Sequence, residues 1–259
     1  MDNGFTQNSD FDQVFMTDME LVKKIVSCAD LKKDDTVLEI GTGMGNLTEI
    51  IAGRCRKVIS VEIDEKLKPR LKKRFSGKKN VELVFSNALD VIGKIDFDSM
   101  VSNPPYSISE PLVKQLFRKS FRTAVLTMPW RFVERLTANP EERAYSKLSL
   151  FSQAFFRTEI ILKVPQEAWS PIPGTESVVI RLTPRKASGD AESLVRELAL
   201  QSDKKLKNTL RESMVKIMGK TKKSARKAMD DYGFTERLLD RKVSEMDLRD
   251  IQHILERIG

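Results

Sequence analysis

Histidine and cysteine are scarce in this sequence, and their scarcity restricts its chemistry. The single histidine is His253, which excludes a histidine-based catalytic triad and a zinc site with several histidine ligands. We therefore expect no metal. The two cysteines, Cys28 and Cys55, form no Cys-x-x-Cys pattern, so we expect reduced thiols and a cytoplasmic location.

Long apolar runs are missing as well. No run approaches the roughly 20 residues that a transmembrane helix needs, and Met1–Asp10 lacks the basic and apolar segments of a secretion signal. Acidic residues are outnumbered, since 45 lysines and arginines oppose 37 aspartates and glutamates, a net charge of +8. This balance favours nucleic acid over a membrane as the partner, with a merely basic soluble surface as the alternative.

What the sequence does contain is an alternation of short β-rich runs with helical stretches such as Asn46–Arg54 and Glu65–Phe75. This alternation predicts a parallel, doubly wound α/β sheet. A proline-rich loop, Pro165–Gly174, joins the last two runs, so we expect those two to pair antiparallel at one edge. The seven predicted strands are Thr36–Ile40, Val58–Glu62, Val81–Phe85, Ser99–Ser102, Thr123–Met128, Thr158–Val164 and Val178–Leu182.

The end of the chain is predicted to be helical. Residues 187–259 carry helical periodicity without a strand pattern, so we predict a small all-α domain after a sheet domain of residues 1–186. Lys204–Lys227 holds ten basic residues against one acid, and Lys66–Lys79 is a second basic cluster. Such clusters are either solvated helix faces or contacts to RNA phosphates, and the net charge favours RNA. Upstream, Asn139-Pro140-Glu141-Glu142 has the pattern of a helix start.

A glycine-rich turn follows the first predicted strand. Gly41, Gly43 and Gly45 precede a predicted helix, and glycines let the backbone approach a ligand closely. Asn46 stands where a dinucleotide-binding fingerprint has its third glycine, which disfavours NAD. The next strand ends in Glu62, 17 residues after Gly45, where a carboxylate can bind both hydroxyls of a ribose. The alternatives are a turn that binds nothing and a surface acid.

The fourth strand leads into Asn103-Pro104-Pro105-Tyr106. The exocyclic amine of adenine is a poor nucleophile because its lone pair is delocalised into the ring. If the Asn103 side-chain carbonyl and the Pro104 backbone carbonyl each accept one N–H, that nitrogen moves toward sp³ geometry, and Tyr106 can stack on the base. Proline suits this role because it fixes the direction of the carbonyl. A plain Pro-Pro turn is the alternative.

These motifs occur in an order that resembles one family, the KsgA-type rRNA adenine N6,N6-dimethyltransferases. The resemblance covers about residues 11–186. Its most specific part is Val164-Pro165-Gln166-Glu167-Ala168-Trp169-Ser170-Pro171-Ile172-Pro173, a block that other Asn-Pro-Pro-Tyr methyltransferases lack. The other matching blocks are Phe11–Asp18, Val37–Thr48, Val61–Asp64, Asn87–Leu89, Asn103–Ser109 and Glu176–Leu182.

The resemblance implies a Rossmann-like methyltransferase sheet that uses S-adenosylmethionine. It also implies a monomer that dimethylates adenines of small-subunit rRNA, free or in a pre-ribosomal particle. Tyr106 and Trp169 would sandwich the target base, with Trp169 as a core residue the alternative. The implied catalytic residues are Asn103, Pro104, Tyr106 and Trp169. The implied cofactor contacts are Gln13, Val14, Met16, Gly41, Gly43, Glu62, Ile63, Asn87, Ala88 and Asn103.

Several positions depart from the family pattern. Val14 replaces an asparagine, Asn87 an aspartate, and Pro104 a leucine or isoleucine. Pro104 is instead typical of enzymes that add a single methyl group to adenine or glutamine. Two rival functions stay open: methylation of DNA adenine N6 or protein glutamine N5, and a non-catalytic ribosome assembly factor. An assembly factor would be expected to have lost Asn103 or Gly41, and both are present.

Overall fold

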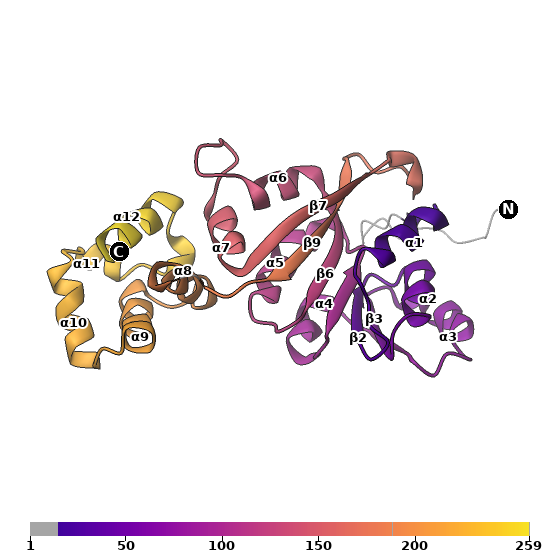
Figure 1. Cartoon of the computed structure of the whole chain (residues 1–259), viewed down its shortest axis with the longest axis horizontal. Helices are drawn as coiled ribbons and strands as arrows, with labels where there is room; N and C mark the ends of the chain where they lie inside the picture. The colour runs from indigo at the N-terminus through magenta and orange to yellow at the C-terminus, as the bar shows by residue number, and fades with distance from the viewer. Residues whose placement is uncertain (1–14, 188, 259) are drawn as a thin grey trace. The chain divides into compact units, whose positions relative to one another are not determined.

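A seven-stranded sheet forms the centre of the amino-terminal part of the computed structural model, which describes residues 15–187 and 189–258 (Figure 1). The order of the strands is β4-β3-β2-β5-β6-β9-β7. Their bounds are β2 Thr36–Ile40, β3 Lys57–Glu62, β4 Val81–Phe85, β5 Ser99–Ser102, β6 Thr123–Pro129, β7 Phe156–Val164 and β9 Ser177–Pro184. All seven predicted strands are present, and β9 and β7 are neighbours at one edge, as expected from the short loop between them.

The pairing of the strands is mostly parallel. β2 pairs parallel with β3 and β5, β3 with β4, and β5 with β6, whereas β9 pairs antiparallel with β6. In β2, Val37 and Leu38 are successive residues that face opposite sides of the sheet, and both are fully buried. A sheet covered on both faces is typical of parallel α/β folds. The predicted fold class is therefore confirmed.

Helices connect and cover the strands. α1 begins after Asp18, whose carboxylate accepts hydrogen bonds from the backbone N–H groups of Glu20 and Leu21, both at 3.0 Å. Apolar residues of α1 and α2, such as Val22, Ile25 and Ile51, form one core cluster with the strands. The helices of this part are α1 Met19–Ser27, α2 Asn46–Ala52, α3 Lys68–Arg74, α4 Ala88–Val91, α5 Ser109–Leu116 and α6 Trp130–Thr137.

A two-stranded sheet joins sequence segments that are far apart. β1 (Phe15–Met16) pairs antiparallel with β8 (Trp169–Ser170), so that Met16 lies opposite Trp169. The contact is extended by Thr17, whose backbone N–H donates to the carbonyl of Ala168 at 2.9 Å. The described part of the Phe11–Asp18 block and the Val164–Pro173 block, both singled out in the sequence, are therefore in contact. Gln13 and Val14 lie outside the described residues.

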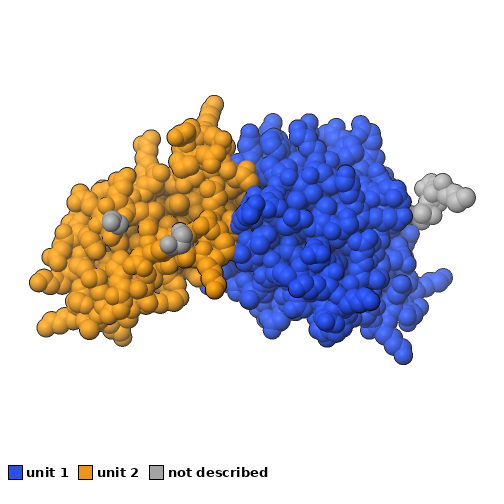
Figure 2. Space-filling view, in the orientation of Figure 1, with its two compact units in different colours: residues 1–134, 157–184 blue, residues 135–156, 185–259 orange. Residues whose placement is uncertain are grey.

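The chain divides into two compact units, shown in different colours in Figure 2. The first contains the sheet and comprises the chain up to Glu134 together with Arg157–Pro184; the second comprises Arg135–Phe156 and the chain from Arg185 onward. The helices of the second unit are α7 Lys147–Phe155, α8 Asp190–Leu200, α9 Leu206–Met218, α10 Lys222–Asp231, α11 Glu236–Leu239 and α12 Leu248–Ile258. None of the described helices is long and apolar enough to cross a membrane.

This division differs from the boundary predicted at residue 186, because residues 135–156 belong to the second unit. Polar contacts explain their place. The ammonium group of Lys147 donates to the carbonyls of Ser244 and Met246, each at 2.9 Å. The Arg196 Nε–H of α8 donates to the carbonyl of Ala154 at 2.8 Å. These partners lie so far along the chain that local sequence patterns carry no sign of them.

The prediction that a helix starts at Asn139 is wrong. Residues 140–144 form turns and a bend, and α7 begins only after Ser146. The local hydrogen bond of a helix start is present, because the Glu142 carboxylate accepts from the Asn139 backbone N–H at 3.0 Å. However, residues 139–143 are exposed and have no apolar side chain buried. Helical stability comes mainly from packing an apolar face, so the turn does not propagate.

Candidate functional site

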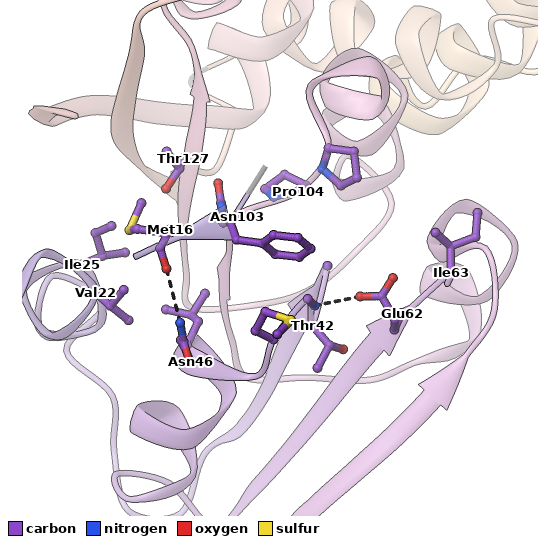
Figure 3. Close-up of a pocket in the computed structure, with 16 residues that line it drawn as sticks. Met16, Val22, Ile25, Thr42, Asn46, Glu62, Ile63, Asn103, Pro104 and Thr127 are labelled. Atoms are coloured by element: carbon purple, nitrogen blue, oxygen red, sulfur yellow. Dashed lines mark hydrogen bonds between the residues drawn. The ribbon is translucent and has the colours of Figure 1, made fainter. Parts of the chain in front are cut away.

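A pocket lies at the carboxyl ends of the parallel strands, where open α/β sheets bind their ligands (Figure 3). Its residues come from β1, α1, the glycine-rich turn and the start of α2, from the end of β3 and the loop after β5, and from β6. They are Phe15, Met16, Val22, Ile25, Gly41, Thr42, Gly43, Met44, Asn46, Leu47, Glu62, Ile63, Asn103, Pro104, Pro105 and Thr127. Seven of the predicted site residues are therefore brought together: Met16, Gly41, Gly43, Glu62, Ile63, Asn103 and Pro104.

Glu62 is fixed by the backbone around it. One carboxylate oxygen accepts the N–H of Gly43 at 2.7 Å (Figure 3). The other accepts the N–H of Asp64 at 2.9 Å. Burial raises the pKa of this carboxyl, while the hydrogen bonds from the backbone lower it. Each oxygen keeps a further lone pair that can accept a hydrogen bond. The arrangement can therefore hold two adjacent hydroxyl groups.

The glycines of the turn are required by the structure. Gly41 has φ of +84°, and a Cβ there would come within 3.1 Å of the Asn103 backbone carbonyl. Gly45 also has φ of +84°, and a Cβ there would lie 2.8 Å from the Phe75 ring. L residues rarely adopt this left-handed conformation. The turn therefore presses directly against the Asn-Pro-Pro-Tyr loop.

Asn103 and Thr127 bring unpaired polar atoms to the pocket. Asn103 Oδ1 is buried and accepts no hydrogen bond from any described residue. The hydroxyl of Thr127, a residue within β6, is likewise buried and without a hydrogen-bond partner in the described part of the chain. A buried polar atom without a partner costs folding free energy, so such atoms need an explanation. Their position in a ligand-sized pocket points to a bound molecule.

Tyr106 and Trp169 are in contact, but they do not form a parallel sandwich. Their ring centroids are 6.4 Å apart and the rings are nearly perpendicular, at 83°. The Tyr106 hydroxyl hydrogen-bonds to the Ser177 hydroxyl of β9. Trp169 is only 3% exposed and belongs to the core cluster. Tyr106 is half-buried, so it is the ring of this pair that is more open to a base.

Asn87 and Ala88 are not among the residues that line the pocket. Asn87 is the N-cap of α4, and its side-chain oxygen accepts the N–H of Leu89 at 3.0 Å. Its amide N–H₂ group is a donor that a purine ring nitrogen could accept from. Ala88 is buried behind it. The structure therefore shows Asn87 as a helix N-cap. Contacts of Asn87 and Ala88 with the cofactor remain a prediction.

Arg74 is a residue that the sequence analysis did not single out. It belongs to the basic cluster Lys66–Lys79, yet its guanidinium donates to the carbonyl of Met44, to Asn46 Oδ1 at 3.1 Å and to the Glu49 carboxylate at 2.6 Å. The Asn46 amide in turn donates to the Met16 carbonyl at 3.3 Å (Figure 3). Arg74 therefore fastens α3 to the glycine-rich turn. Its position within a basic run gave no sign of this role.

A buried network lies beneath the turn. The Glu39 carboxylate accepts hydrogen bonds from the Thr48 and Ser60 hydroxyls at 2.5 and 2.6 Å, and Ser60 also contacts the Thr42 hydroxyl at 2.6 Å. Burial raises the pKa of Glu39 to about 8, although both hydrogen bonds act in the opposite direction. Glu39 is therefore largely protonated at neutral pH. Of the four residues in this network, only Thr42 lines the pocket. Glu39, Thr48 and Ser60 support the glycine-rich turn from below.

Seven of the ten basic residues of Lys204–Lys227 fall into two groups, one paired with acids and one not. Lys204 pairs with Glu212 at 2.7 Å, and Lys205 and Lys207 pair with Asp240 at 3.4 and 2.7 Å. Four residues of α10 are exposed and make no ion pair with any residue of 15–187 or 189–258: Lys222, Lys223, Arg226 and Lys227. Spacings of four residues place them on one side of the helix. They form a basic face, here called the α10 face.

The sheet order, the glycine-rich turn and the Asn-Pro-Pro-Tyr loop together define a Rossmann-like methyltransferase. Comparison with known proteins agrees. The family model described as ribosomal RNA adenine dimethylase matches residues 4–232. This chain therefore belongs to the ribosomal RNA adenine dimethylase family.

Relatives and solved structures place the chain within that family. A probable ribosomal RNA small subunit methyltransferase A of Methanosarcina mazei is 39% identical over 206 residues, which are 77% of this chain and 76% of the relative. A protein of the same description from Methanococcus maripaludis is 33% identical over 90% of this chain and 92% of its own. A dimethyladenosine transferase from Plasmodium falciparum has a TM-score of 0.64 at 25% identity, covering 92% of this chain and 95% of that one. The 23S rRNA methyltransferase ErmE has a TM-score of 0.61 at 25% identity, over 94% and 98%.

Proposed function

We propose that the protein transfers methyl groups from S-adenosylmethionine to the N6 amine of adenines in small-subunit rRNA, ending at N6,N6-dimethyladenosine. The observation that carries this proposal is the unpartnered Asn103 Oδ1, buried beside the glycine-rich turn. A hydrogen-bond acceptor in that position suits a substrate amine, because the amine has N–H groups to donate. Family membership and the names of the relatives support rRNA as the source of that amine.

The pocket fits the cofactor. Glu62 offers carboxylate oxygens to the ribose hydroxyls, and Ile63, 41% exposed, offers an apolar surface beside them. Gly43 leaves room that a side chain would fill, since a Cβ there would lie 3.2 Å from the Phe15 ring. When bound, S-adenosylmethionine supplies an electrophilic methyl group on a sulfonium. We propose that Met16, Gly41, Gly43, Glu62, Ile63 and Asn103 hold it, with Gln13, Val14, Asn87 and Ala88 as further contacts.

The chain's own part in the chemistry is to position the amine and accept its hydrogens. The Asn103 side-chain carbonyl and the Pro104 backbone carbonyl each accept one N–H of the adenine amine, which localises the nitrogen lone pair and directs it at the methyl group. No side chain is needed as a strong base, because the methylated nitrogen is cationic and loses its proton to water. Asn103 therefore acts as an acceptor, in keeping with its uncharged side chain.

Aromatic contact holds the flipped base. Tyr106 stacks on the adenine, and its hydrogen bond to Ser177 fixes the plane of the ring. Trp169 packs against Tyr106 edge to face and so supports its ring, although neither residue is among those that line the pocket. A direct stacking contact from Trp169 would require its ring to turn out of the core. The α10 face and the exposed lysines of Lys66–Lys79 supply the positive charge that binds rRNA phosphates.

The test is to identify the molecule that carries the methyl mark. Purified protein is incubated with labelled S-adenosylmethionine and, in separate reactions, small-subunit particles, duplex DNA and a protein extract. We expect methylated adenosine in the RNA of the particles, and mass spectrometry of nucleosides and peptides reads the outcome. Asn103→Ala is expected to abolish the signal, even at S-adenosylmethionine concentrations that saturate the variant. A mark on DNA adenine or on glutamine would contradict the rRNA assignment.

A further inference from the structure

We propose that Thr127 is a specificity-determining residue whose hydroxyl donates a hydrogen bond to a ring nitrogen of the target adenine that flanks the amine. This inference rests on the proposed function, because it assumes adenine as the substrate. The side chain is fully buried, its hydroxyl has no partner among the described residues, and it lines the pocket. The sequence analysis gave it no role.

The sheet places Thr127 level with Asn103. The parallel register pairs Ser102 of β5 with Leu126 of β6, so Asn103 and Thr127 are the next residues of neighbouring strands. Neighbouring strands lie about 4.8 Å apart, and side chains at the same level point to the same face of the sheet. Figure 3 shows both side chains together at the end of the pocket away from Glu62 and Ile63. One small planar group can therefore reach both.

The strand order decides which part of the reaction Thr127 faces. Glu62 ends β3, Gly41 follows β2, Asn103 follows β5 and Thr127 lies within β6, two residues before its end. These four strands are consecutive in the sheet. If Glu62 holds the ribose and Asn103 the reacting amine, then Thr127 lies one strand beyond the amine. That is the side of the target base. Thr127 is also held rigidly, because β6 is paired on both sides and Thr127 lies opposite Val179 of β9.

The chemistry of the two unpaired atoms matches the edge of adenine. A side-chain amide oxygen only accepts hydrogen bonds, whereas a hydroxyl both donates and accepts. Adenine presents an N–H donor at N6 next to acceptor nitrogens, N1 on one side and N7 on the other. Asn103 Oδ1 would take the N–H, and the Thr127 hydroxyl would donate to the neighbouring nitrogen. A guanine, with a carbonyl at the corresponding carbon, would leave Asn103 facing an acceptor.

Two substitutions separate this role from a structural one. Thr127→Val keeps the shape and removes the hydroxyl, whereas Thr127→Ser keeps the hydroxyl. If the hydroxyl serves only the substrate, Thr127→Val should melt at the same temperature as the wild type or higher, since an unpaired buried polar group is removed. Its single-turnover methylation rate on small-subunit particles should fall about tenfold, the value of one hydrogen bond. Thr127→Ser should recover most of that rate.

The decisive measurement uses particles reconstituted with rRNA whose methylated adenine is replaced by 1-deazaadenosine or 7-deazaadenosine. One analogue should slow the wild type about tenfold and should not slow Thr127→Val further, because the two changes remove the same hydrogen bond. S-adenosylmethionine binding, measured by calorimetry, should be the same in both proteins.

The proposal would be overturned if the analogue slowed Thr127→Val by the same factor as it slows the wild type, because the two rate effects would then be independent. It would also be overturned if Thr127→Val bound S-adenosylmethionine weakly. An unchanged rate in Thr127→Val would overturn it too. Failure of the proposed function looks different, since the wild type would then leave ordinary particles unmethylated.

Discussion

Glu62 combines two roles at the level of a single residue. Its carboxylate accepts the N–H groups of Gly43 and Asp64, so it shapes the loop, and Glu62 also lines the pocket with lone pairs still available. Glu62→Ala should therefore weaken S-adenosylmethionine binding by about 1.5–3 kcal/mol, the range for hydrogen bonds to a charged group. Isothermal calorimetry measures this change.

The matched control for Glu62 is Glu65→Ala. Glu65 is also acidic and close in sequence, but it is exposed and pairs with Lys68 at 2.8 Å. The Glu65→Ala substitution should leave the affinity for S-adenosylmethionine unchanged. NAD should bind neither protein measurably, since Asn46 replaces the third glycine of the dinucleotide fingerprint. Equal affinity for NAD and S-adenosylmethionine would refute the assignment of this pocket.

Glu39 gives the folded protein a predicted pH dependence. Burial raises its pKa from 4.5 to about 8, so between these values the folded state keeps a proton that the unfolded chain has lost. The free energy of unfolding should therefore fall as pH rises through this window, by at most about 1.4 kcal/mol per pH unit from this group. Glu39→Gln cannot ionise and should remove that slope, becoming more stable than the wild type toward pH 8.

Urea unfolding at several pH values across the window checks the prediction for Glu39. The control is Glu20→Gln, since the Glu20 side chain is 84% exposed and its substitution should leave the slope as it is. A slope that is identical in wild type and Glu39→Gln would show that Glu39 is ionised in the folded protein.

At the level of elements, α10 presents a basic surface made of four exposed side chains, the α10 face. Thr221 caps the helix by accepting the N–H of Ser224 at 3.1 Å, and Gly219 lets the chain turn out of α9 with φ of +63°. Lys222→Glu with Lys223→Glu should weaken binding to small-subunit particles. It should also reduce the slope of log K against log salt by roughly 0.7–0.9 for each phosphate that the variant no longer neutralises. Filter binding across a salt series measures both.

The control for the α10 face changes the same number of charges elsewhere in the second unit. Arg237 and Arg249 are exposed and lie outside the basic run, so reversing both should leave the salt slope nearly unchanged. Lys204 and Lys205 are unsuitable, because they pair with Glu212 and Asp240, so their reversal would also break ion pairs within the protein. If both double variants lower the slope equally, the effect is one of net charge and α10 is an ordinary solvated face.

The elements also show which local patterns are reliable. The strands β2, β4 and β5 have the bounds predicted for them, because each is a short apolar run that ends in a turn motif. Asn139-Pro140-Glu141-Glu142 has equally good capping chemistry but no apolar face behind it, and it stays a turn. Patterns that include burial therefore predicted structure here, whereas capping alone did not.

For the whole molecule, the sharpest prediction concerns the final product. After the first transfer the amine has one N–H left, so only one of the acceptors at Asn103 and Pro104 can be used. The base must then be held mainly by aromatic contact, worth about 1–3 kcal/mol per base. We expect monomethyladenosine as a transient and dimethyladenosine at completion.

Nucleoside mass spectrometry over a time course measures the product. Trp169→Ala, which removes the support of Tyr106, should slow the second transfer more than the first, whereas Asn103→Ala should block both. Monomethyladenosine that accumulates without conversion would refute dimethylation and point to Pro104, the residue shared with single-methylation enzymes.

Local sequence was enough to predict the fold class, the glycine-rich turn and the Asn-Pro-Pro-Tyr loop. These features are apolar runs of fixed period, glycines where φ is positive, and a polar loop at the end of a strand. Because the carboxyl ends of parallel strands meet at one edge, Gly41, Glu62 and Asn103 could be expected together before the structure was considered.

Which distant groups meet depends instead on how the whole chain packs. Packing pairs Met16 with Trp169, fastens Arg74 to the glycine-rich turn, and assigns residues 135–156 to the second unit. It also buries Trp169 in the core and leaves the Thr127 hydroxyl unpaired beside Asn103 among the described residues. Each of these depends on contacts between segments that are distant in the sequence, or on burial by several elements at once. A local pattern has no access to such contacts, because they are set only when the elements come together.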